Sequence, residues 1–61
     1  MTNKEKRLRQ RLEILYQQLE LYRRHPEDFH TALGIKGTAE WLNRTLDEVI
    51  KKRKEIEELN R

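Results

Sequence analysis

Apolar side chains recur in two lines, one in each half of the chain. The first line runs at alternating steps of four and three residues through Leu8, Leu12, Leu15, Leu19 and Tyr22. The second line makes the same steps through Leu42, Leu46, Val49, Arg53 and Ile56. Because these steps follow the α-helical turn of about 3.6 residues, each line occupies one face of a helix. The pattern predicts an all-α fold, a hairpin of two amphipathic helices with a short connecting helix.

The first helix carries further apolar positions on its flank. Ile14 and Leu21 are seven residues apart and share that flank with Arg7, Arg11 and Gln18. The apolar line and the apolar flank of this first helix together span a wider arc than one partner helix can cover. The central segment of the chain, a second subunit or a foreign partner could cover the flank, and all three alternatives remain open.

Proline and glycine divide the chain. Pro26 ends a helix before it and suits the first position of a new one. Gly34 suits a helix C-terminus, and Thr38 is a good N-cap after a connector at 35–37. One domain over residues 1–61 is predicted, with helices at about 4–23, 26–33 and 38–59. The expected details are an N-cap at Thr2 or Asn3 and a short helix whose Phe29, Ala32 and Leu33 fold back on the hairpin.

Length and composition suggest self-association. The chain has 61 residues, of which 34% are apolar and 41% charged, so the core of a single hairpin would be thin. We therefore expect a homodimer resembling a four-helix bundle. Without cysteine there are no disulfides or thiolate metal sites. We expect no metal, no cofactor, no small-molecule substrate and no membrane association, and a cytoplasmic location.

Positive charge is concentrated near both ends. Residues 1–11 sum to +4 and residues 51–61 to +2, whereas residues 12–50 sum to −3. An antiparallel hairpin would bring the two positive segments together into one basic end. In the second long helix, three acids each precede a base by four residues, which predicts the ion pairs Glu40/Arg44, Asp47/Lys51 and Glu48/Lys52. The unpaired basic surface should then lie mainly on the first helix.

Residues for catalysis are scarce. His25 and His30 flank Glu27 and Asp28, but their spacing points the two rings in different directions, so we interpret them as surface histidines. The available hydroxyl groups lack a paired base, and there is no glycine-rich phosphate loop. We predict that the chain is not an enzyme.

Arg53 and Trp41 each allow two interpretations. Arg53 could set register or oligomeric state from within the apolar line, or extend its charge to the rim. Trp41 could be a binding hot spot or pack against the protein's own core, with Phe29 as its neighbour.

A helix-turn-helix over residues 35–54 is an alternative for the second half. Ala39, Leu42, Asn43, Thr45 and Val49 occupy acceptable positions of that motif. Other positions do not fit, because Gly37 would lie inside the motif's first helix. A continuous helix explains the same apolar spacing without a turn.

The segment Leu46-Asp47-Glu48-Val49-Ile50 resembles the second helix of the short sporulation-type aspartyl-phosphate phosphatases, which are hairpins that act on response regulators. That family has Ser-Gln-Glu-Leu-Asp where this chain has Asn43-Arg44-Thr45-Leu46-Asp47. The resemblance implies that Asp47 is the functional carboxylate.

The sequence favours a small non-enzymatic regulatory or adaptor protein of bacterial or phage type, which binds a protein partner through a helical face. The predicted protein-binding residues are Arg7, Arg11, Ile14, Gln18 and Leu21. The first alternative is a nucleic-acid-binding regulator, and the second is an aspartyl-phosphate phosphatase. The basic residues that would bind nucleic acid are Lys4, Lys6, Arg7, Arg9, Arg11, Lys51 and Lys52.

Overall fold

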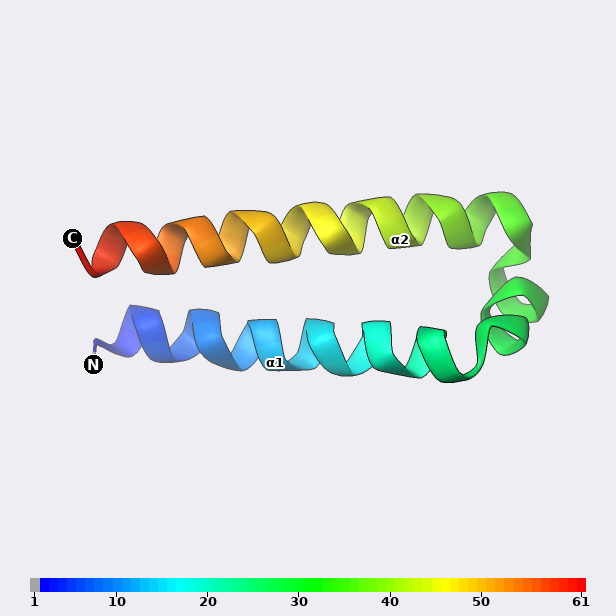
Figure 1. The fold of residues 1–61 in the computed structure, drawn as a ribbon, viewed down its shortest axis with the longest axis horizontal. Coiled ribbons are helices and arrows are strands. Elements are labelled where there is room, and N and C mark those ends of the chain that lie inside the picture. Colours follow the sequence, from blue (N-terminus) through cyan, green and yellow to red (C-terminus); the bar gives the residue numbers. More distant parts are fainter. Residues whose placement is uncertain (1) are drawn as a thin grey trace.

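A computed structural model describes residues 2–61, which form an antiparallel hairpin of two long helices (Figure 1). Helix α1 spans Asn3–Arg24 and α2 spans Pro26–Leu59, with His25 alone between them. The Cα trace extends 41 × 16 × 14 Å, and both chain ends lie at the same end of the hairpin. The predicted all-α hairpin is confirmed. Within residues 2–61, no helix is long and apolar enough to cross a membrane.

Local signals explain the ends of α1. The Thr2 hydroxyl is the N-cap and accepts a hydrogen bond of 3.1 Å from the Glu5 backbone N–H. At the other end, the His25 N–H donates to the Leu21 carbonyl at 2.9 Å, and Pro26 then begins α2. The N-cap is therefore Thr2, one of the two predicted candidates.

Helix α2 contains one break, at Gly34. Its φ of 75° and ψ of 168° are non-helical, whereas residues 35–37 are already helical. The predicted connector at 35–37 is therefore wrong. Thr38 is not an N-cap either, because the three residues before it are helical and its hydroxyl donates to the carbonyl oxygens of Gly34 at 2.7 Å and Phe29 at 3.1 Å. These acceptors satisfy a threonine within a helix.

Among residues 2–61, five apolar residues form the core between the helices. Leu8, Leu12 and Leu15 of α1 pack with Val49 and Ile56 of α2. Leu19 is partly buried beside them, so the apolar line predicted for the first helix is confirmed.

The buried line of α2 departs from the predicted one at two positions. Leu46 is 42% exposed and Arg53 is exposed, while Thr45 is 6% exposed and Lys52 is half-buried. The Thr45 hydroxyl donates to the Trp41 carbonyl at 2.7 Å, which allows this polar residue to be buried. Turning α2 toward Thr45 also brings Trp41 and Glu48, which lie on the same side of the helix, toward α1.

Aromatic side chains close the turn end of the core. The ring centroids of Phe29 and Trp41 are 4.7 Å apart, and Tyr22 lies 5.3 Å from Phe29 and 5.7 Å from Trp41. The predicted contact between Trp41 and Phe29 is confirmed. Ala32 and Leu33, expected to fold back with Phe29, are exposed instead. In the first turns of α2, before the break at Gly34, the Phe29 and His30 rings lie against Tyr22, at centroid distances of 5.3 and 6.4 Å.

Candidate functional site

The helical register defines one long face on each side of the buried line. We call the first the basic face and the second the groove face. The basic face consists of Arg7, Arg11, Ile14, Gln18 and Leu21 of α1 with Arg44, Glu48, Lys51 and Glu55 of α2. The groove face consists of Arg9, Glu13, Tyr16 and Glu20 of α1 with Leu46, Ile50, Arg53 and Glu57 of α2.

The basic face holds the five residues predicted to bind a protein. Ile14 is 46% and Leu21 is 52% exposed, and Gln18 between them is also exposed. The first turns of α2 pack against Tyr22 and Trp41 and leave Ile14 and Leu21 uncovered. Of the three alternatives for covering this flank, the central segment of the chain is therefore eliminated.

An ion pair joins the two helices on the basic face. Arg11 donates from Nε and Nη2 to the two carboxylate oxygens of Glu48, at 2.7 and 3.2 Å. These hydrogen bonds and the attraction of the positive charge lower the pKa of Glu48. No salt bridge among residues 2–61 joins Glu48 to Lys52, Glu40 to Arg44 or Asp47 to Lys51, so these predicted pairs are wrong. Glu48 therefore binds Arg11 of the other helix and not Lys52 of its own helix, because arginine can bind both carboxylate oxygens at once.

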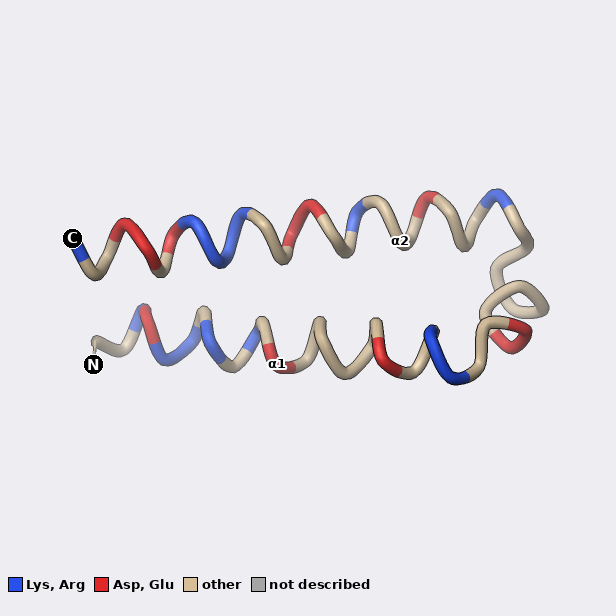
Figure 2. Tube along the Cα trace, in the orientation of Figure 1, with Lys and Arg blue, Asp and Glu red and all other residues tan. Residues whose placement is uncertain are grey.

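The basic segments lie side by side at the terminal end of the hairpin, as predicted. Figure 2 shows the positive stretch near the N-terminal end of α1 beside the positive stretch near the C-terminal end of α2. The structure changes how many of these charges are unpaired. Arg11 is bound to Glu48, Arg9 lies 3.7 Å from Glu5, and Lys52 is half-buried. Lys4, Lys6, Arg7 and Lys51 remain exposed.

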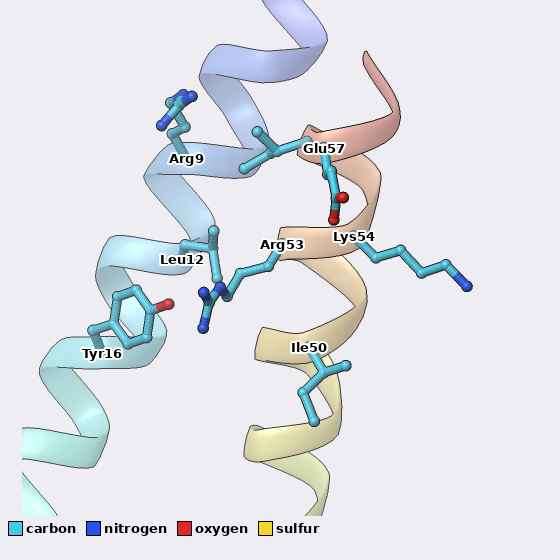
Figure 3. Close-up of a pocket in the computed structure, with 8 residues that line it drawn as sticks. Arg9, Leu12, Tyr16, Ile50, Arg53, Lys54 and Glu57 are labelled. Carbon is cyan, nitrogen blue, oxygen red and sulfur yellow. The ribbon is translucent and has the colours of Figure 1, made fainter. Parts of the chain in front are cut away.

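The groove face was missed at the sequence level. An open groove of about 650 Å³ runs between the helices, with Leu12 and Ile56 beneath it and Tyr16 and Ile50 along its sides. Figure 3 shows Arg53 extending from α2 toward α1, near Leu12 and Tyr16. Ile50 is 64% and Tyr16 is 46% exposed. The assignment of Leu46 and Arg53 to the buried line obscured this second apolar strip.

Charges border the apolar strip of the groove face. Arg53 and Glu13 are exposed and form no salt bridge among residues 2–61. Glu20 binds Arg23 at 2.6 Å and Arg24 at 3.1 Å, and the hydrogen bond from Arg23 contributes most to lowering the pKa of Glu20 to about 2. Glu20 is therefore neutralised within its own helix, while Arg53 and Glu13 are available to a partner.

The remaining sequence candidates are not brought together into one site. Asp47 is exposed, two residues beyond buried Thr45, and therefore lies on the outer side of α2. Residues 35–54 form one continuous helix, so the two helices and turn of a helix-turn-helix are not present there. The His30 ring lies 6.4 Å from Tyr22, and residues 2–61 contain no group of three or more acidic or histidine side chains placed to hold a metal ion.

Comparisons of the chain with protein-family models, curated proteins and solved structures found no match.

Proposed function

We propose that this protein is a small non-enzymatic regulatory or adaptor protein that acts as a homodimer and binds a protein partner through the basic face. The observation that carries the proposal is the exposure of Ile14 and Leu21, 46% and 52%, on a flank that the folded chain leaves uncovered. Two apolar residues two helical turns apart, with a polar residue between them, form the kind of surface that an amphipathic partner helix recognises.

The charges around this strip indicate the partner's chemistry. Arg7 and Arg11 share its flank on α1, and Arg44 and Lys51 lie on the same face of α2. Four positive side chains stand against two acids, Glu48 and Glu55, and Glu48 is already bound to Arg11. An acidic amphipathic helix would match both the apolar strip and its basic border.

A paired substitution tests the proposal. Ile14→Asp with Leu21→Asp should abolish retention of an acidic partner by the immobilised protein, because it places two negative charges in the apolar strip. The matched control is Gln10→Asp with Gln17→Asp, which changes two exposed α1 residues at the same spacing outside the basic face. The control should retain the partner, and both variants should keep the helical circular-dichroism spectrum. Equal retention by both variants, or unfolding caused by the first, would contradict a binding role.

Nucleic-acid binding is the second candidate, favoured by the side-by-side basic segments in Figure 2. Phosphate contacts by Lys4, Lys6, Arg7 and Lys51 would make affinity strongly dependent on salt. Affinity for labelled duplex DNA or RNA should fall by about tenfold or more between roughly 50 and 200 mM salt. Arg7→Ala should weaken binding to all sequences alike. Failure to bind either duplex at low salt would eliminate this candidate.

A further inference from the structure

We infer that the groove face is the surface on which a second copy of this chain docks, with the two hairpins parallel and their chain ends at the same end of a four-helix bundle. The inference deepens the proposed function, because it rests on the homodimer included there and specifies its interface. The groove is open and has an apolar floor, with Leu12 from α1 and Ile56 from α2. Ile50, 64% exposed beside it, would be buried by a second hairpin.

The spacing of the groove face supports pairing between α1 of one copy and α2 of the other. On α1 the face steps by four, three and four residues through Arg9, Glu13, Tyr16 and Glu20. Read in the opposite direction, α2 makes the same steps through Glu57, Arg53, Ile50 and Leu46. Antiparallel neighbouring helices place residues with this matched spacing at the same levels.

At these levels the two helices are complementary in charge and character. Arg9 of one copy meets Glu57 of the other, Glu13 meets Arg53, and Tyr16 meets Ile50. A two-fold axis along the hairpin generates each contact twice, as a closed dimer requires. Glu20, opposite Leu46, already has its charge compensated by Arg23 and Arg24 of its own helix. Glu13 and Arg53 thus pair two charges that form no salt bridge among residues 2–61 of their own chain, whereas Arg9 and Glu57 already lie 3.7 and 3.6 Å from Glu5 and Arg61 of the same chain.

The basic face lacks this self-complementarity. Its positive side chains outnumber its acids, and its strongest acid–base contact, between Arg11 and Glu48, is already made within one chain. Two copies meeting there would bring like charges together.

Charge exchange tests the interface. Analytical ultracentrifugation should show a dimer for the unaltered chain. Arg53→Glu should raise the dimer dissociation constant by about tenfold or more, because it creates two like-charge contacts with Glu13. Adding Glu13→Arg to the same chain should restore the dimer. The matched control is Lys51→Glu, an equal charge reversal on the basic face, which should leave the dimer unchanged.

Cross-linking tests the orientation, since the chain contains no cysteine of its own. A mixture of Tyr16→Cys and Ile50→Cys chains should form mixed disulfide dimers under mild oxidation, and each variant alone should form few. Strong self-cross-linking of Ile50→Cys would overturn the parallel arrangement. A dimer unaffected by Arg53→Glu would overturn the groove face as the interface while leaving the proposed homodimer intact. A protein that is monomeric at every concentration would overturn both the homodimer and this inference.

Discussion

Thr38 and Thr45 show that burial in this chain does not always follow the hydrophobicity of the side chain. Both threonines are almost fully buried, and their hydroxyls bond carbonyl groups four residues earlier, at 2.7 Å in each case. Within residues 2–61, no buried side-chain nitrogen or oxygen lacks a hydrogen-bond partner. A small polar residue that satisfies itself within its helix can therefore occupy a buried position.

At the same scale, the Arg11–Glu48 pair predicts a pH dependence. The pKa of Glu48 lies below its ordinary value of 4.5 in the folded protein, because Arg11 binds the charged carboxylate. The pair therefore stabilises the fold above the unfolded-state pKa, and this stabilisation is lost as pH falls through the lowered pKa. Acidification from neutral pH should lower the melting temperature, and Glu48→Gln should make that decrease smaller.

A second variant isolates the cause of this effect. In an NMR titration of the carboxylates, Arg11→Gln should return the pKa of Glu48 toward 4.5. Glu40→Gln is the control for the melting experiment, since Glu40 is exposed and forms no salt bridge among residues 2–61. An unchanged Glu48 titration in Arg11→Gln would show that the pair does not form in solution.

At the scale of the element, α2 depends on its two glycines in different ways. Gly34 has a φ of 75°, a backbone angle that residues with a side chain rarely adopt, although a Cβ there would meet no atom within 4 Å. Gly37 lies in regular helix, and a Cβ there would lie 3.4 Å from the Leu33 Cβ. Glycine is needed at position 34 for its backbone conformation, whereas the helical backbone at Gly37 can be adopted by a residue with a side chain.

Alanine at the two glycines should therefore act in opposite directions. Gly34→Ala should destabilise the fold by about 1–3 kcal/mol because of the backbone conformation. Gly37→Ala should stabilise it by about 0.5–1 kcal/mol because it improves helix propensity. Urea unfolding of both variants measures the two free energies. A Gly34→Ala variant as stable as the parent would indicate that α2 continues without the break.

At the scale of the whole molecule, stability rests on a narrow line of side chains. Leu15 is 2% exposed and belongs to the five-residue core found among residues 2–61. A domain of 61 residues has a free energy of unfolding of about 3–9 kcal/mol. Removing a buried leucine side chain beyond Cβ costs about 2–5 kcal/mol, a large fraction of that total.

Leu15→Ala should therefore leave much of the protein unfolded near physiological temperature, as measured by circular dichroism during heating. The control is Ile35→Ala, which removes a side chain that is 79% exposed, and it should change stability by less than about 1 kcal/mol. Similar melting temperatures for both variants would place the main core elsewhere.

The sequence alone determined the first helix, the antiparallel pairing and the α1 contribution to the core, because these follow from local spacing and from Pro26. It did not determine the break in α2, which lies at Gly34 and not at 35–37. It also predicted that Ile14 and Leu21 would lie beside the main apolar line. The rotation of α2 was decided only in the tertiary structure, since Leu46 and Thr45 fit a helical period equally well. Two contacts favour the rotation that buries Thr45 instead of Leu46: the packing of Trp41 in the aromatic cluster and the hydrogen bonds between Arg11 and Glu48. That rotation exposes Leu46, Ile50 and Arg53 and so creates the groove face. The sequence could not decide the rotation, because helical periodicity is a property of one helix, whereas these contacts depend on both helices at once.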